Sequence, residues 1–336
     1  MIPSRFGGVT AAANALRRAL GVLWIADALV KLSLPFGDRP GEQAYEQIMT
    51  AESGPPGFHR LLATEAHAFT GHPLLWWLPA AVELGIGVWL VTRPSSRRAL
   101  AALGAWAVIV WLAGEGAGGL LSGVASVLTG YPGAALLYAV ASVVLFPAAR
   151  PPEGAASAAE SGAAGQWSRV AWLALWIGAA YFTALPQTGS NGLEFMLTVN
   201  QADGAGPLRA LDSRVLGWLT IGTMTRLGFA VAALCVLIGF TVLLGVWPRV
   251  FLSLAIGLAL AAWVVFQNFG GIYTGAATDV GTGPVLILLA LAYWPLRGGR
   301  RQQAGKARSA AAAAPVPADR GGAQAPAAGE EASAVG

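Results

Sequence analysis

Long apolar stretches recur along this chain, and each is close to the roughly 20 residues that an α-helix needs to cross a hydrocarbon core of about 30 Å. The composition agrees, because 55% of the 336 residues are hydrophobic and only 11% are charged, whereas a typical soluble domain has about 25% charged residues. The sequence therefore predicts an all-α membrane protein with about eight transmembrane helices. The expected spans are 15–35, 73–92, 99–115, 132–149, 168–186, 226–246, 250–267 and 283–297.

The distribution of arginine and lysine predicts how these spans are oriented. Loops that stay in the cytoplasm carry the positive excess. Basic residues precede the first span, separate spans two and three, four and five, and six and seven, and follow the last span. We therefore expect a multi-pass protein of the cell (plasma) membrane with both termini cytoplasmic. Because the basic residues flank spans instead of forming one soluble face, the expected partner is the lipid bilayer and not nucleic acid.

An internal repeat divides the chain. At an offset of 152 residues, Trp111 to Pro132 aligns with Trp263 to Pro284 without a gap, and the same offset places Trp24 on Trp176. An even number of helices per copy makes the copies parallel, related by an axis near the membrane normal. The sequence thus predicts two parallel tandem four-helix bundles. The expected domains are a first repeat over 1–149, a cytoplasmic linker over 150–166, a second repeat over 167–297 and a disordered cytoplasmic tail over 298–336.

Each copy contains a glycine-rich segment between its third and fourth helices, expected on the outer face. Glycine permits a positive φ and a close approach of backbones. One interpretation is a tight turn that lets helices pack. The other is a re-entrant or pore-rim loop that offers polar groups to a ligand, which requires cover by protein or a water-filled cavity. The residues concerned are Glu115, Gly118 and Gly119 in the first copy, and Gln267, Asn268, Gly270 and Gly271 in the second.

Three ionisable residues fall within predicted spans. Asp27 and Lys31 are four residues apart in the first span and share one face, and Glu83 lies near the middle of the second. Such groups face the bundle interior because charge in the bilayer is costly. Either Asp27 pairs with Lys31 as a helix clamp beside a protonated Glu83, or the three form a pocket for a quinone head group, a proton or a small substrate, opening near Glu115.

The aligned positions in the second copy carry no charge, so we expect the first bundle alone to hold this pocket. They are Ala179, Thr183 and Cys235.

Cysteine and histidine add little chemistry. Cys235 is the only cysteine, so no internal disulfide can form. His59, His67 and His72 lie in the first outer loop, 36–72, where surface positions are a better interpretation than a metal or haem site. This loop and its counterpart, 187–225, are expected to contain short helices on the membrane surface.

The helix-two segment VELGIGVWLVTRPSSRRALAAL, with the lysine that closes the first helix, resembles the DoxX-like four-helix membrane proteins, in a duplicated, actinobacterial-type bacterial subgroup. The matching positions are Lys31, Glu83, Gly87 and Arg93. The second copy lacks the matching lysine and glutamate. The resemblance implies similarity to a subunit of a quinone-linked thiosulfate oxidoreductase, or to partners of redox or detoxifying proteins; such an analogy does not establish activity.

Three functions remain open at this level. The leading hypothesis is a redox-associated role, as a quinone-facing subunit or accessory of a partner oxidoreductase in the membrane or periplasm. The alternatives are a small-solute or proton-coupled transporter or channel, and a membrane scaffold. The sequence shows no motif for a nucleotide, flavin, haem or iron–sulfur centre, so quinone is the cofactor considered, and no catalytic residue is assigned.

Overall fold

The computed structural model describes residues 7–33, 55–69, 72–121, 125–149, 152, 154–185, 193–194, 196–198, 200–201, 206–274 and 277–296. Within these ranges the chain is helical and forms no β-strand, which confirms the all-α prediction. Three helical segments are long and apolar enough to cross a membrane: Arg97–Gly114, Gly222–Leu244 and Pro248–Phe266. The predicted tail, 298–336, lies outside the described residues.

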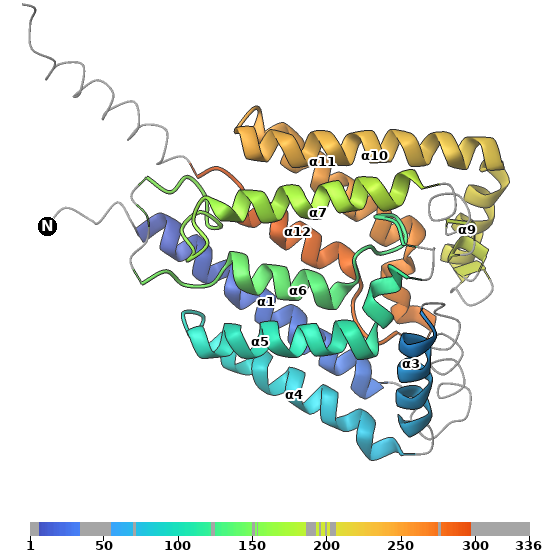
Figure 1. Ribbon diagram of the computed structural model, residues 1–336, viewed down its shortest axis with the longest axis horizontal. Helices are drawn as coiled ribbons and strands as arrows, with labels where there is room; N and C mark the ends of the chain where they lie inside the picture. The colour runs from blue at the N-terminus through green and yellow to red at the C-terminus, as the bar shows by residue number, and fades with distance from the viewer. Residues whose placement is uncertain are drawn as a thin grey trace, which may run out of the picture.

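Each predicted span overlaps a helix. Most helices run roughly along the long axis of the molecule, whereas α3 and α9 lie across one end, called here the α3 end (Figure 1). The start of α1 and the α4–α5 and α10–α11 turns lie at the opposite end. The helices are α1 (Gly7–Ser33), α3 (Pro56–Phe69), α4 (Pro73–Thr92), α5 (Arg97–Ile109), α6 (Ala134–Val144), α7 (Trp167–Ala184), α9 (Gly206–Trp218), α10 (Ile221–Leu244), α11 (Pro248–Ala261) and α12 (Thr282–Ala292).

Local sequence signals explain several helix ends. The Ser96 side chain accepts a hydrogen bond from the Ala99 amide at the start of α5, and Thr220 caps α10 through the Thr223 amide in the same way. Such caps satisfy amides that have no partner within the helix. Gly245 ends α10 at a φ of 68°, a left-handed conformation that glycine adopts at little cost.

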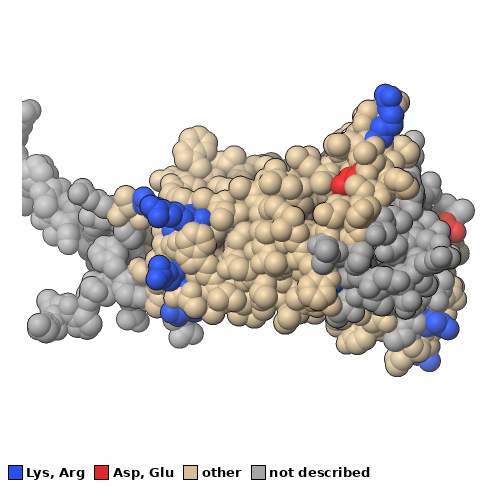
Figure 2. Space-filling view, turned by 90° about the horizontal axis from the view of Figure 1, so that it is seen from below, with Lys and Arg blue, Asp and Glu red and all other residues tan. Residues whose placement is uncertain are grey.

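Charge is segregated along the molecule. On the face shown in Figure 2, charged side chains lie toward the two ends and a broad uncharged zone separates them. Large apolar side chains are exposed on the long helices, among them Phe229 at 55% and Leu237 at 51% on α10. Apolar surface of this extent on a soluble protein would mark an interaction site, and it suits a helix surface in contact with lipid.

Helices α6 and α12 differ from the predicted spans 132–149 and 283–297, which were too long. Each has only 11 residues, or about 16 Å at 1.5 Å per residue. Both are buried along most of their length, including Leu137 and Tyr138 in α6 and Leu288 in α12. Both helices lie in the middle of the molecule (Figure 1).

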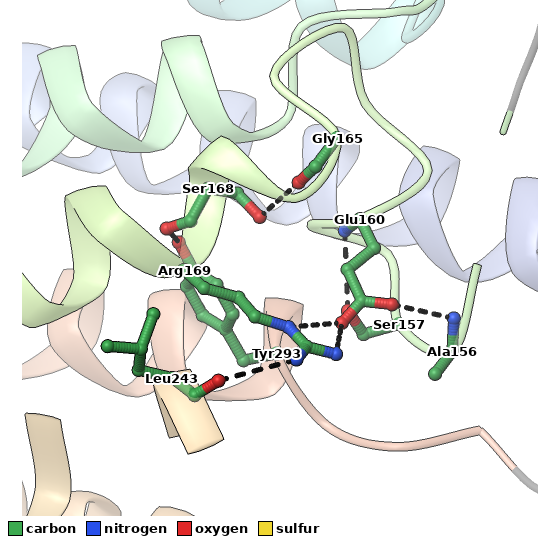
Figure 3. Close-up of polar contacts among 8 residues, drawn as sticks. All are labelled: Ala156, Ser157, Glu160, Gly165, Ser168, Arg169, Leu243 and Tyr293. Carbon is green, nitrogen blue, oxygen red and sulfur yellow. Dashed lines mark hydrogen bonds and ion pairs between the residues drawn. The ribbon is translucent and has the colours of Figure 1, made fainter. Parts of the chain in front are cut away.

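The predicted linker, 150–166, is folded where the structure describes it. The Ala159 amide donates to the Ala292 carbonyl at 2.8 Å, and the Ala163 amide donates to the Phe146 carbonyl at 2.7 Å. Figure 3 shows the Glu160 carboxylate bound to Arg169, at 2.5 Å between Oε1 and Nη2. These contacts attach the linker to the ends of α6, α7 and α12.

The two halves do not match in structure over the full length of their gap-free sequence alignment. The Trp111 indole donates to the Pro132 carbonyl, 21 residues later, at 2.8 Å. The Trp263 indole donates to the Val280 carbonyl, only 17 residues later, at 2.7 Å. The connection before α12 is therefore shorter than the one before α6. The identical prolines aligned by sequence are not equivalent in space, because Pro132 precedes α6 whereas Pro284 lies inside α12.

Candidate functional site

A cavity of about 210 Å³ lies near the α3 end of the molecule. Asp27, Lys31 and Glu83 all line it, together with Glu115. The four ionisable residues that the sequence singles out are therefore brought together. The other lining residues are Trp24, Glu65, Phe69, Pro79, Trp106, Ile109, Val110, Ala113, Gly114, Ala134, Ala135, Tyr138, Thr278 and Asp279.

Close packing of α1 against α4 positions Lys31 and Glu83 as an ion pair. A methyl group added at Gly87 would lie 2.9 Å from the Gly21 carbonyl oxygen, so the two backbones touch where both residues are glycine. One turn along α4 from Gly87, Glu83 Oε2 lies 2.8 Å from Lys31 Nζ. Lys31 is 9% exposed and Glu83 is 1% exposed. The ion pair is buried, and either partner left alone would be a buried, uncompensated charge.

Asp27 does not pair with Lys31 as a helix clamp, so that interpretation is wrong. Its Oδ1 atom accepts a hydrogen bond from the Val280 amide at 2.8 Å, and its side chain is buried, at 2% exposure. Val280 follows Asp279, which also lines the cavity. The expectation that the first bundle alone forms the pocket is therefore wrong as well, because the segment before α12 closes one side of it.

Glu115 connects the cavity to the start of α6. It follows the π-helical turn Val110–Gly114, and its Oε1 accepts a hydrogen bond from the Ala135 amide at 2.9 Å. Gly118 makes this approach possible, because it has a φ of 63° and a Cβ there would lie 2.0 Å from the Pro132 carbonyl oxygen. The glycine-rich segment thus packs its backbone tightly against the start of α6, and Glu115 from the same segment lines the cavity.

The corresponding polar residues of the second half form hydrogen bonds with other side chains of the protein. Gln267 Oε1 accepts a hydrogen bond from the Thr282 hydroxyl at 2.9 Å. Asn268 Nδ2 donates to Asp212 Oδ2 at 3.1 Å. Neither residue lines the cavity, and neither do Gly119, Gly270 or Gly271. Of the predicted loop residues, only Glu115 belongs to this candidate site.

Three aromatic residues of the cavity wall contain polar atoms without a normal hydrogen bond. They are the Trp24 and Trp106 indole nitrogens and the Tyr138 hydroxyl, and Glu115 Oε2 is unpartnered too. Tyr138 faces Asp27 and Trp106 faces Glu83, each close enough for a weak side-chain hydrogen bond that falls outside ideal geometry. Buried polar groups are normally paired, so the Trp24 indole, which has no acceptor, is the aromatic donor of the wall that is available to a ligand.

Sequence reasoning missed Trp106, Tyr138 and Asp279 as site residues. Trp24 was noted only for its alignment with Trp176. No local signal marks any of them, because aromatic residues are common in apolar helices. Trp24 contacts Tyr138 edge to face, with ring centroids 4.4 Å apart, and this contact depends on how α1 meets α6.

The end of the molecule near the cavity carries the predicted surface helices. Helix α3 contains His59 and His67, and its Glu65 and Phe69 line the cavity. Helix α9 lies at the same end (Figure 1). Across the residues that the structure describes, no three histidine, cysteine or acidic side chains are grouped so that they could hold a metal ion. Cys235 is buried.

Comparison with known proteins identifies no relative for this arrangement. No family model, no curated protein and no solved structure matches the chain.

Proposed function

We propose that this chain is a multi-pass cell-membrane protein made of two parallel four-helix repeats, with both termini and the linker in the cytoplasm. The uncharged middle zone supports a membrane-spanning arrangement, and Figure 2 shows basic side chains near both of its ends. More arginines lie before and early in α1, around the α4–α5 and α10–α11 turns and at the start of α7 than in the loops 36–72 and 187–225, which supports this orientation. The repeat is supported by paired local structures: π-helical turns at Val110–Gly114 and Ala262–Phe266, each followed by left-handed residues. The same proposal includes a relationship to the DoxX-like membrane proteins, which the sequence resembles.

The function that the cavity supports best is binding of a quinone head group, in a redox-associated role beside a partner oxidoreductase. The observation that carries it is the unpaired Trp24 indole nitrogen, which lines the cavity beside the Trp106 and Tyr138 rings. A quinone ring is flat, and its carbonyl oxygens accept hydrogen bonds. It could pack against the aromatic rings and supply the acceptor that the Trp24 indole lacks. The wall is otherwise mostly apolar, as ligand pockets usually are.

Quinone retention and titration test this function. We expect the detergent-purified protein to contain extractable quinone and, after its removal, to bind a methyl-naphthoquinone saturably by calorimetry. Trp24→Phe removes one donor and should weaken binding roughly fivefold, since one hydrogen bond contributes about 1 kcal/mol. Trp176→Phe is the matched control, because its indole nitrogen is also buried and unpaired but does not line the cavity. Absence of saturable binding, or equal weakening by both variants, contradicts the proposal.

A second candidate, proton-coupled transport, is favoured by a different observation. The short central helices α6 and α12 begin inside the molecule, where their first turns meet Glu115 and Gln267 respectively. Transporters use interrupted helices of this kind to hold substrates and ions. Counter-flow of a solute in proteoliposomes, dependent on a proton gradient and abolished by Glu115→Gln, would favour this function over quinone binding.

A further inference from the structure

Carboxylates outnumber cations around the cavity. Among its described lining residues, Lys31 is the single lysine or arginine. The acidic lining residues come from three parts of the fold: α1 and α4, the turns next to α6 and α12, and the surface helix α3. They are Asp27, Glu65, Glu83, Glu115 and Asp279.

The one cation is already engaged. Lys31 Nζ lies 2.8 Å from Glu83 Oε2, and both side chains are buried. An anionic ligand that used Lys31 would have to displace Glu83, which would then be a buried carboxylate without a counter-ion. Such a group costs several kcal/mol in general. The ammonium group is therefore poorly placed to attract an acid.

The second half adds a further negative charge. Asp279 is held by the Gly281 amide at 2.6 Å and by the Thr278 hydroxyl at 3.3 Å. The next amide, Val280, donates to Asp27. This contact fixes the segment against α1 and places the Asp279 carboxylate on the cavity wall.

We infer that the cavity admits neutral or cationic aromatic ligands and rejects acidic ones, and that Glu83 and Asp279 set this preference. The inference rests on the proposed function, since it specifies the class of ring that the aromatic wall accepts. Lys31 and Glu83 neutralise each other, and the other acidic side chains of the wall offer no counter-charge to an anion, so a further negative charge is disfavoured. Among the described lining residues, an acidic ring would find no cation without a partner.

Charge-matched ligands test the preference. The purified protein in phosphatidylcholine nanodiscs is titrated with a neutral methyl-naphthoquinone, a naphthoquinone sulfonate, a naphthyl methylammonium and a naphthoate. We expect each anion to bind at least roughly tenfold more weakly than its uncharged or cationic counterpart. Asp279→Asn should reduce this difference in affinity between anionic and other ligands. Glu83→Gln should reduce it further, because Lys31 loses its counter-ion. Glu194→Gln, an exposed acid that does not line the cavity, is the control.

The outcomes separate the two claims. Equal binding of anionic and neutral rings, or a difference in affinity that neither cavity variant reduces, overturns the charge preference and leaves quinone binding intact. Failure of the quinone alone, with the ammonium still preferred to the carboxylate, overturns the proposed function and keeps the preference. If no ring ligand binds, both are wrong. Circular dichroism and thermal unfolding of each variant establish that a change in affinity is not a loss of fold.

Discussion

The two halves of the molecule pack their first helices in the same way but use them for different chemistry. In each half a glycine lies at the crossing of two helices: Gly87 meets α1, and Gly239 meets α7, where an added Cβ would lie 3.2 Å from side-chain atoms of Leu173 and Trp176. Beside the first crossing lie buried charges. At the aligned positions beside the second lie Ala179, Thr183 and Cys235, all at most 2% exposed. Similar packing therefore does not require the polar cluster.

The halves also contact each other reciprocally. The Val280 amide of the second half donates to Asp27 on α1, and the Val127 amide of the first half donates to the Thr183 hydroxyl on α7 at 3.2 Å. Each first helix thus supplies an acceptor to the connection of the other half. The Asp27 contact closes a cavity wall, whereas the Thr183 contact joins two buried residues.

Lys31→Met should have the largest effect on stability. It leaves Glu83 buried without its counter-ion, at a cost of about 3 to 5 kcal/mol. Thr183→Val at the aligned position should cost much less. Thermal unfolding in detergent measures both, and the double variant Lys31→Met with Glu83→Leu should recover most of the loss. A Lys31→Met protein as stable as wild type would show that the pair is not structurally required.

Gly118→Ala should come next, with a loss of about 2 to 4 kcal/mol from backbone strain and overpacking. A Cβ there would lie 2.0 Å from the Pro132 carbonyl oxygen, and at Gly270 it would lie 2.6 Å from the Val280 carbonyl carbon, so both halves should respond. Gly245→Ala controls for the left-handed conformation, because its φ is 68° and no atom lies within 4 Å. Equal losses at Gly118 and Gly245 would rule out the steric explanation.

Thr183→Val should have the smallest effect of the three. It removes the acceptor of the Val127 amide, and one hydrogen bond contributes about 1 kcal/mol. Asp27→Asn should weaken the hydrogen bond from the Val280 amide even less, since the asparagine side-chain oxygen can also accept it. Hydrogen exchange at the Val127 and Val280 amides measures the effect of each variant on its own hydrogen bond. Faster exchange at Val280 in the Thr183 variant would mean that the two contacts are not independent.

Much of the helical architecture could be predicted because apolar length and charge placement act locally. The eight apolar segments are helices, and α3 and α9 occur in the two loops expected to hold surface helices. The lengths of α6 and α12 could not be predicted. The expected spans continue past the ends of these helices through apolar residues such as Phe146 and Trp294. Non-helical backbone within a bilayer needs cover by protein, and that cover comes from the tertiary structure.

The sequence by itself determined which polar residues must be buried, since the high cost of a charge in an apolar environment forces Asp27, Lys31 and Glu83 inward. Only the tertiary structure decided how they are paired. Lys31 selects Glu83 because the glycine contact brings α4 close to α1, and Asp27 is satisfied by Val280 from the other half of the chain. A hydrogen bond between residues 253 positions apart leaves no local signal, so the cavity wall that it completes exists only in the folded protein.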